Sequence, residues 1–382
     1  MMLSKNILER GPAKYFHGRD KERHIFKSLL HETIHRGMGS SFLIQGAPGV
    51  GKTALIDQCC RLAQEEKWHI VRLNLRSLYD EEEFYRRLTK NKSRHQVKKR
   101  YGVDLHLFKA DIESQRSKAF DYLNERIIQS QPTLLYLDEA QTLGTMVSAE
   151  QKNRVTNFLN TYHNLESKKG FILLIGGLSM TKEILRDVGI SRWNRLCFHR
   201  LGRLEAEAER QILDDWLQKE IKTPSDTKQW LNAITKQTDG WPSHIEAYCH
   251  ALSEYLKPQE TLSEKTLKQV LDYGNHLKDL YYDQRYDGIP YEYRQLVVQS
   301  LESLNTTFLK KDIIASFATS LSEKKAEELY DIIEAKGIID MNSHGLCGVP
   351  IPSLRHHLIE TYGKKTMTSV SKKPPRQPST FD

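Results

Sequence analysis

Apolar and polar residues alternate with two different periods along the first 200 positions of the chain. Short apolar runs fit buried strands, whereas the longer segments between them carry apolar residues at helical spacing. Five strands are predicted, at residues 41–45, 69–75, 133–138, 171–176 and 196–201. Strands that alternate with helices predict an α/β fold with a parallel sheet that helices cover on both faces.

Helical periodicity dominates the part of the chain that follows. Amphipathic patterns predict helices at 205–221, 226–238 and 243–256, which together suit a small helical lid over residues 205–258. A polar helical linker is expected over residues 259–289.

Residues 290–362 predict a winged-helix-like domain. Three helical patterns precede two short strands that flank Ser343-His344-Gly345, and a last helix closes the unit. The third helix begins after Ser322, a typical N-cap residue, and ends at Gly337, which suits the left-handed position after a helix. The two strands would form the wing.

The overall composition is that of a globular protein without a membrane span. The 382 residues carry a net charge of +8, with 38% apolar and 28% charged residues. No apolar run approaches the length of a membrane-spanning helix, and residues 1–14, an N-terminal extension, lack the apolar core of a secretory signal. Five scattered cysteines without CxxC spacing predict reduced thiols in a cytoplasmic protein. The basic tail at 363–382, rich in Pro, Ser and Thr, is expected to be disordered.

A glycine-rich stretch follows the first predicted strand. Residues 46–53 read GAPGVGKT, a complete Walker A motif between a strand and a helix. Its glycines let backbone N–H groups surround phosphate oxygens, Lys52 brings a positive charge to the β- and γ-phosphates, and the hydroxyl of Thr53 can bind Mg²⁺. The residues expected to bind ATP are Gly46, Ala47, Pro48, Gly49, Val50, Gly51, Lys52, Thr53 and Ala54.

A second motif supports the first. Residues 133–139 read TLLYLDE, an apolar strand that ends in two carboxylates, as in a Walker B motif. Asp138 is expected to hold Mg²⁺ together with Thr53, and Glu139 to orient and polarise the attacking water. An Asp-Glu pair after a strand is often only a helix cap, but its position after a complete Walker A motif favours catalysis.

Residues 31–35, HETIH, match the H-E-x-x-H pattern of zinc proteases. However, they belong to an amphipathic helix that leads into the strand before the Walker A motif, and no third ligand follows at the required spacing. We therefore interpret His31 and His35 as exposed histidines on a packing helix and reject the protease hypothesis.

Further segments resemble a known family. Residues 16–22 look like a GR-x-x-E box, residues 191–203 like the arginine-bearing segment before the last core strand, and residues 238–245 like the G-x-P motif of a helical lid. With the Walker motifs, they make the chain similar to AAA+ ATPases of the origin-recognition type and to the related STAND signalling ATPases. The resemblance implies a P-loop NTPase (AAA+) fold with an ATPase core at 15–204, a lid and a C-terminal winged helix.

The resemblance also implies a homo-oligomer that forms on ATP binding, in which an arginine finger reaches the nucleotide of a neighbouring subunit. Arg192 and Arg195 are the candidates, although both can equally be solvated arginines. Two departures from the family pattern stand out. Ser243 replaces the arginine that often follows the G-x-P proline, and Ser179 is the only polar candidate after the fourth strand. Hydrolysis is therefore expected to be slow or stimulated by a partner.

The densest basic run lies between the second and third strands. It contains Arg86, Arg87, Lys90, Lys92, Arg94, Lys98, Lys99 and Arg100, without an acidic residue. Such a run is either a solvated surface or a contact with phosphate groups of DNA. The third helix of the winged-helix-like domain is a second candidate for DNA, but it mixes lysines with several acidic residues, and packing against the ATPase core as a switch is an equal alternative.

We therefore expect an ATPase that acts as a nucleotide-driven switch or loader on DNA, like replication initiators or mobile-element ATPases, with ATP and Mg²⁺ as cofactors. The alternative is a STAND-type signalling or defence ATPase that its winged helix holds closed. The sequence identifies no protein partner.

Overall fold

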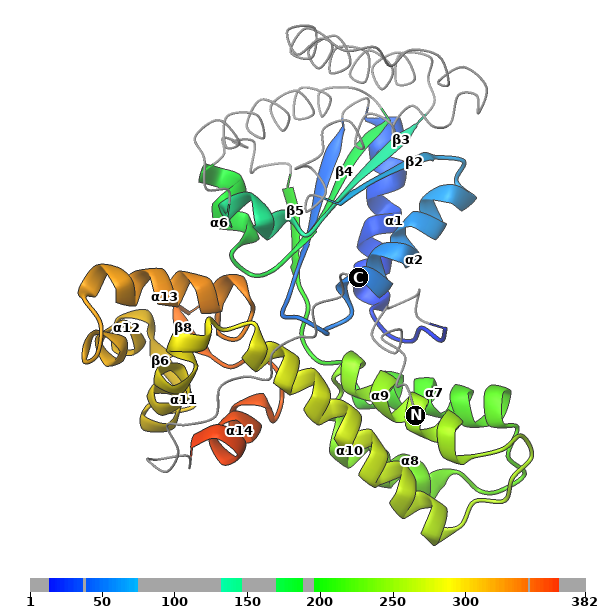
Figure 1. The fold of residues 1–382 in the computed structure, drawn as a ribbon. Coiled ribbons are helices and arrows are strands. Elements are labelled where there is room, and N and C mark those ends of the chain that lie inside the picture. Colours follow the sequence, from blue (N-terminus) through cyan, green and yellow to red (C-terminus); the bar gives the residue numbers. More distant parts are fainter. Residues whose placement is uncertain are drawn as a thin grey trace, which may run out of the picture. The chain divides into compact units, whose positions relative to one another are not determined.

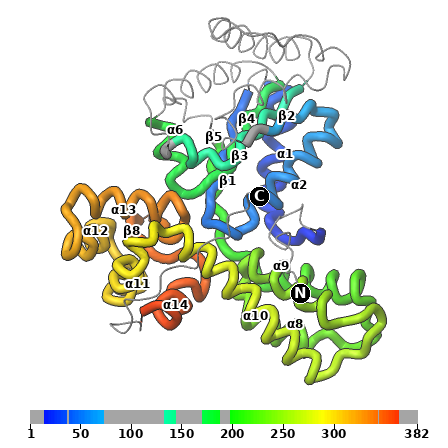
Figure 2. The backbone as a smooth tube through the Cα atoms, viewed as in Figure 1, coloured from blue at the N-terminus to red at the C-terminus, as the bar shows by residue number. Residues whose placement is uncertain are grey.

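The computed structural model describes residues 14–36, 39–74, 132–145, 170–187, 196–342 and 344–363. The chain divides into two compact units, Met1–Lys278 and Asp279–Asp382, which are described one after the other. Figure 1 shows the helices and strands of both units, and Figure 2 follows the same backbone as a tube. None of the helices in these ranges is long and apolar enough to cross a membrane.

The first unit is built on a five-stranded parallel sheet. Its strands are β1 (Ser40–Gln45), β2 (His69–Asn74), β3 (Thr133–Asp138), β4 (Phe171–Gly177) and β5 (Leu196–Arg200), in the order β2-β3-β4-β1-β5. All four pairings are parallel, and every strand begins and ends within one residue of its predicted position. The α/β prediction is confirmed. The sheet order places β4 between the strand before the Walker A motif and the strand of the Walker B motif.

Continuous apolar sequence explains why these strands lie at the centre of the unit. The side chains of β4 are all buried, as are those of Phe42, Leu43 and Ile44 in β1. Two helices, α1 (Asp20–His35) and α2 (Lys52–Glu65), pack against each other and against the sheet. They lie next to each other beside the sheet in Figure 1.

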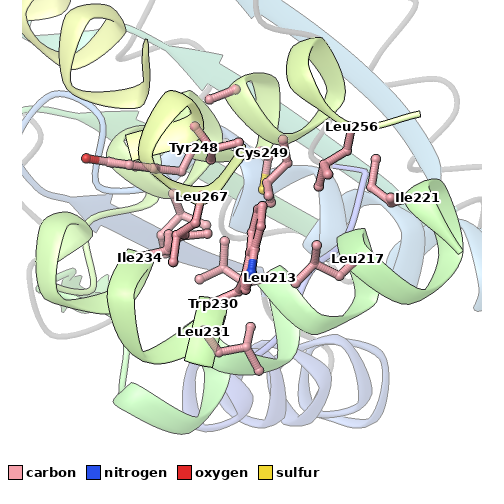
Figure 3. Close-up of a cluster of buried hydrophobic side chains, with 14 residues drawn as sticks. Leu213, Leu217, Ile221, Trp230, Leu231, Ile234, Tyr248, Cys249, Leu256 and Leu267 are labelled. Carbon is pink, nitrogen blue, oxygen red and sulfur yellow. The ribbon is translucent and has the colours of Figure 1, made fainter. Parts of the chain in front are cut away.

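Four helices form the lid. They are α7 (Ala206–Asp215), which continues as a π-helical turn at Trp216–Ile221, α8 (Lys228–Thr238), α9 (Pro242–Tyr255) and the first part of α10 (Glu264–Asp287). Their apolar faces meet in one cluster, in which side chains such as Leu213, Trp230 and Cys249 converge (Figure 3). This burial stabilises the lid in the usual way, because the apolar stripes of short helices leave water together.

The expected linker at 259–289 differs from what the structure contains. Helix α10 is continuous, and its first half contributes Leu267 and Val270 to the lid cluster. The contact is close at Gly274, where an added Cβ would lie only 2.4 Å from the ring of Tyr248. The hydroxyl of Tyr248 also donates a hydrogen bond of 2.8 Å to Asn275 Oδ1. The first half of α10 is therefore part of the lid, and the boundary between the units falls inside this helix, after Lys278.

The second unit contains helices α11 to α14 and a small sheet. Its elements are α11 (Arg294–Ser303), β6 (Thr307–Leu309), α12 (Lys310–Ala318), α13 (Glu323–Ala335), β7 (Asp340–Met341), β8 (Leu346–Gly348) and α14 (Leu354–Leu358), which runs on as a π-helical turn at Ile359–Gly363. The strands form an antiparallel sheet in the order β6-β8-β7. The order of elements is helix, strand, helix, helix, strand, strand, helix.

Strand β6 was not predicted from the sequence. It is three residues long, and only Phe308, opposite Cys347 of β8, is buried. The strand leads directly into α12, where the carboxylate of Asp312 accepts a hydrogen bond of 2.9 Å from the backbone N–H of Leu309. A strand this short shows no alternation that a pattern could detect.

Candidate nucleotide-binding site

The glycine-rich loop between β1 and α2 is a tight turn. Gly49 and Gly51 have φ angles of 78° and 91°, in the left-handed region that side chains disfavour. Gly46 has no room for a side chain, because an added Cβ would lie 2.7 Å from Val50 Cγ1. Gly51 precedes the first residue of α2, Lys52, so the loop ends at the N-terminus of a 14-residue helix. Backbone N–H groups and the positive end of the helix dipole gather at this point.

The ammonium group of Lys52 lies over the loop. Its Nζ donates hydrogen bonds of 2.8 Å to the carbonyl oxygen of Gly46 and 3.1 Å to that of Ala47. Thr53, the next residue, is exposed on the first turn of α2, with its neighbour Ala54 half-buried. A positive charge and a hydroxyl therefore lie together where the loop meets the helix, as the Walker A motif predicts.

The carboxylates predicted for the Walker B motif lie at the carboxyl end of β3. Asp138 Oδ1 accepts a hydrogen bond of 2.9 Å from the backbone N–H of Glu139. Burial raises the pKa of the Asp138 carboxyl, and the positive charge of Lys52 acts on it in the opposite direction. The two motifs, 86 positions apart (138 − 52), thus lie close enough in space for their charges to interact.

The neighbouring strand β4 has a glycine beside Asp138, at a position with no room for a side chain. A Cβ on Gly176 would lie 3.5 Å from Asp138 Oδ1 and 2.8 Å from Ile56 Cδ1. Tyr136 is also adjacent, and its pKa is raised by burial and by the charge of Asp138. A glycine at this point keeps the carboxylate at the edge of the sheet from being covered by a side chain.

Gln141 is a site residue that the sequence did not single out. Its side-chain amide donates a hydrogen bond to Glu139 Oε2, and its oxygen accepts one of 3.2 Å from the backbone N–H of Leu178. The letters DEAQ at 138–141 contain this residue, but nothing in the sequence indicates that its side chain reaches the end of β4.

The first turn of lid helix α9 contacts the loop. The backbone N–H of Ser243 donates a hydrogen bond of 3.1 Å to the carbonyl oxygen of Gly49. A Cβ on Gly51 would lie 3.4 Å from Pro242 Cγ. The segment predicted as the G-x-P motif of the lid therefore packs on the phosphate-binding loop. It brings the neutral side chain of Ser243, rather than an arginine, to this place.

His244 points into the lid instead. It is buried, and its ring Nδ1 donates a hydrogen bond of 3.2 Å to the carbonyl oxygen of Thr238. Burial, together with the positive charge of Lys278, lowers the pKa of His244 to about 3. The side chain is therefore neutral near pH 7 and belongs to the interior of the lid.

Arg19 connects the predicted GR-x-x-E box to the loop. Its guanidinium donates hydrogen bonds to the carbonyl oxygens of Val50, at 3.3 Å, and Gly202. Burial lowers the pKa of Arg19. Gly18 and Arg19 both have positive φ angles, of 75° and 60°, which turn the chain into α1 at this point. The box thus ties the loop to the segment that follows β5.

Several predicted residues lie outside the part of the chain that the structure describes. These are the two candidate arginine fingers Arg192 and Arg195, the basic run from Arg86 to Arg100, and the tail from residue 364 onward.

The histidines of the HETIH segment are on the exposed side of α1. His31 Nε2 lies 4.0 Å from Oε1 of Glu66, the residue that follows α2, and His35 is exposed in the last turn of α1. Within the described ranges, no group of three or more His, Cys, Asp or Glu side chains could hold a metal ion. All five cysteines are free.

Comparisons with known proteins agree with this geometry. Residues 15–175 match the family model of the AAA ATPase domain. The fold is similar to that of a Walker-type ATPase from Pyrococcus abyssi, with a TM-score of 0.60 and 12% identity over 92% of this chain and 99% of the other. Among curated proteins, no sequence shows a significant match.

The ORC2 protein of Aeropyrum pernix is also similar. Its ADPNP–ADP complexes align with a TM-score of 0.55 and 12% identity, over 95% of this chain and 98% of the other. Its ADP form aligns with a TM-score of 0.55 and 13% identity, over 94% and 98%. Residues 15–175 are therefore similar to AAA ATPase domains, and the chain has an AAA+ P-loop NTPase fold that resembles archaeal ORC proteins.

Proposed function

We propose that the chain binds ATP with Mg²⁺ and hydrolyses it to ADP and phosphate. The observation that carries this proposal is the position of Asp138 at the end of β3, across Gly176 from Ile56 of helix α2, which begins at Lys52 directly after a left-handed glycine loop. A cation at the start of a helix and a carboxylate at the end of a nearby strand are what a nucleotide triphosphate and its metal ion require.

The residues on this edge of the sheet fit both the triphosphate and its metal ion. Backbone N–H groups of residues 46–54 and the ammonium of Lys52 would bind the phosphates. The hydroxyl of Thr53 and the carboxylate of Asp138 would hold Mg²⁺, which typically takes one or two protein ligands and keeps several waters. When bound, the metal neutralises charge on the phosphate oxygens. Since metal binding needs the ionised carboxylate, the raised pKa of Asp138 makes this step weaker in acid.

Hydrolysis needs one further group, and Glu139 supplies it in this proposal. A water molecule attacks the γ-phosphorus, and its proton passes to the Glu139 carboxylate. The bond between the γ-phosphorus and the bridging oxygen breaks, so that ADP leaves with the electron pair and inorganic phosphate is formed. Glu139 is half-buried next to Asp138, which places it at the same end of β3.

We further propose that full activity needs a second copy of the chain. The contact of α9 with the loop brings no positive side chain, because Ser243 occupies the position beside Gly49. A neutral hydroxyl stabilises the charge of a transition state less than a guanidinium does. An arginine from a neighbouring subunit, Arg192 or Arg195, would supply the missing charge and make hydrolysis depend on assembly.

DNA is the substrate class that we favour for the resulting switch. The order of elements in the second unit supports a winged helix, with β7 and β8 as the wing. The exposed positions of its third helix, α13, are Glu323, Lys324, Lys325, Glu327, Glu328 and Asp331, where acidic residues outnumber lysines. We therefore assign DNA contact to the basic run at 86–100 rather than to α13. The similarity to an ORC protein does not favour the alternative of a STAND-type signalling ATPase.

Phosphate release from ATP and Mg²⁺, with and without random-sequence duplex DNA, tests this proposal. We expect slow hydrolysis by the parent chain, stimulation by DNA, and loss of both ATP binding and hydrolysis in Lys52→Ala. Tight ATP binding by that variant in calorimetry would refute the site. Hydrolysis that assembly increases but DNA leaves unchanged would refute the assignment to DNA and leave the ATPase intact.

A further inference from the structure

The turn after β3 fixes the backbone of Glu139 from both sides. Its N–H donates to Asp138 Oδ1, and its carbonyl oxygen accepts two hydrogen bonds of 2.9 Å from the N–H and the hydroxyl of Thr142. Glu139 also has a φ angle of 55°, a left-handed conformation that is uncommon for a residue with a side chain. With the backbone held, the direction of the carboxylate depends on its side-chain torsions alone.

Gln141 acts on those torsions. Only 5% of this residue is exposed, and its amide nitrogen donates a hydrogen bond to Glu139 Oε2. The orientation of Gln141 is set by the backbone N–H of Leu178, which donates a hydrogen bond of 3.2 Å to Gln141 Oε1. An amide that is hydrogen-bonded at both ends has one orientation, because rotating it by half a turn would place two donors or two acceptors together.

The segment that orients Gln141 is itself held by a second glutamine. Gln45, 2% exposed, is the last residue of β1 and immediately precedes the glycine loop. Its amide donates a hydrogen bond of 2.8 Å to the carbonyl oxygen of Ser179. Leu178 and Ser179, which directly follow β4, are thus hydrogen-bonded to two different segments. Leu178 bonds to the turn after β3, and Ser179 bonds to the end of β1.

We propose that Gln141 is a positioning residue that orients the Glu139 carboxylate for the attack of water. The inference deepens the proposed ATPase function and depends on it. The hydrogen bond from Gln141 to Oε2 orients the Glu139 carboxylate, which is the group that receives the proton from water. Through Leu178 and Ser179, the orientation of Glu139 also depends on the end of β4 and on Gln45.

The chemistry of the side chain makes this proposal specific. The role needs a donor to a carboxylate and an acceptor for an N–H group at the two ends of one planar group, which an amide supplies. In Gln141→Ala both partners are lost. In Gln141→Glu the shape remains, but an ionised carboxylate cannot donate and repels Glu139. When that carboxyl is protonated at lower pH, it can donate the missing hydrogen bond.

A misplaced catalytic group typically costs about 10²-fold in rate. We therefore expect Gln141→Ala to lower the single-turnover rate of ATP hydrolysis by about 10- to 100-fold, with the affinity for ADP and Mg²⁺ unchanged. At pH 8, the single-turnover rate of Gln141→Glu should fall by at least the same factor. As the pH falls toward 5.5, the rate of this variant relative to that of the parent chain at the same pH should partly recover.

A matched control is available in the lid. Gln211 in α7 also donates a hydrogen bond to a glutamate, of 3.0 Å to Glu207 Oε1, but the pair is exposed and does not touch the loop. Gln211→Ala should hydrolyse ATP at the parent rate. Circular dichroism and ADP affinity show whether each variant is folded. If Gln141→Ala does not fold, the pH dependence of the rate in the isosteric variant Gln141→Glu tests the role of Gln141 instead.

Five outcomes are possible. A lower rate at unchanged ADP affinity, with recovery of Gln141→Glu in acid, supports the role of Gln141. A parent-like rate in either folded variant overturns it, and so does a fall in rate that follows a loss of ADP affinity. An increased rate overturns it as well, since Gln141 would then restrain Glu139. A parent chain that binds ATP but never hydrolyses it would instead overturn the proposed function, and this inference with it.

Discussion

The backbone N–H of Ser243, in the first turn of helix α9, donates a hydrogen bond of 3.1 Å to the carbonyl oxygen of Gly49 in the phosphate-binding loop. The lid is thus attached to the loop through main-chain atoms, next to the packing of Pro242 against Gly51. Any change that moves this loop is therefore expected to move the start of α9 as well.

The first prediction concerns Gly51→Ala. The φ angle of 91° is unfavourable for alanine by about 1–2 kcal/mol, and the new Cβ would lie 3.4 Å from Pro242 Cγ. We expect a less stable protein with at least about tenfold weaker binding of ADP, because the N–H groups that surround the phosphates would shift. Calorimetric titration and chemical denaturation measure the two effects.

Gly202→Ala is the control for that variant. Gly202 also lies near the loop, but no atom is within 4 Å of its added Cβ and its φ angle is not left-handed. Equal losses in both variants would show that the conformation of Gly51 is not the cause.

The second prediction tests Glu139 as the base. Glu139→Gln keeps the size of the side chain but removes the charge that polarises water, so ATP should bind and persist. The rate should fall by about 10²- to 10⁴-fold, measured as phosphate release in a single turnover. Glu65→Gln makes the same change at the exposed end of α2 and should leave the rate unaltered. Unchanged turnover in Glu139→Gln would remove Glu139 from the reaction.

The third prediction concerns acid stability. His244 has a pKa of about 3 in the folded chain because it is buried, against an ordinary value of 6.5 when unfolded. Between these two values the unfolded state binds a proton that the folded state does not, so stability decreases as the pH falls through this window. The contribution of His244 to the change of the free energy of unfolding with pH is at most about 1.4 kcal/mol per pH unit. The variant His244→Gln should lack this contribution to the pH dependence of stability.

Chemical denaturation at several pH values between 3.5 and 7.5 measures the slope of the free energy of unfolding against pH. His250→Gln, on the exposed side of the same helix, is the matched control and should keep the slope of the parent chain. An identical slope in parent and His244→Gln would mean that His244 is protonated in the folded lid.

The fourth prediction concerns the basic run at 86–100. If it contacts phosphates, the triple change of Lys98, Lys99 and Arg100 to alanine should flatten the slope of log affinity against log salt by about two to three. Binding should weaken equally on all DNA sequences, because contacts with the backbone carry no base information. Titrations with a random duplex at several salt concentrations, with ATP and Mg²⁺ present, measure this. Equal slopes would leave the run as a solvated surface.

Most of the fold of the first unit could be predicted because its signals are local. A strand buried on both faces is a continuous apolar run, as in residues 171–176, and such runs are visible without knowing their neighbours. The glycine loop is local too, since its turn, its cation and the following helix are consecutive in the chain. Amphipathic helices of the lid also show their buried faces in their spacing.

The parts that could not be predicted depend on contacts between distant segments. Gln141 meets Leu178, 37 positions away, and an isolated glutamine after a Walker B motif has no pattern that reveals its partner. Arg19 reaches a carbonyl oxygen 183 positions away. The linker expected over 259–289 is polar on average, yet Leu267 and Val270 lie on its buried side and join it to the lid.

The amino-acid sequence was therefore sufficient for the class of fold, the five strands and the position of the glycine loop, because each rests on the chemistry of neighbouring positions. The arrangement of strands as β2-β3-β4-β1-β5, the position of Asp138 across Gly176 from Ile56 of α2 and the hydrogen bond from Ser243 to Gly49 became known from the three-dimensional structure alone. The physical reason is that a hydrogen bond or a charge interaction acts over a few ångströms in space. Sequence spacing fixes that distance only within a single helix, strand or turn.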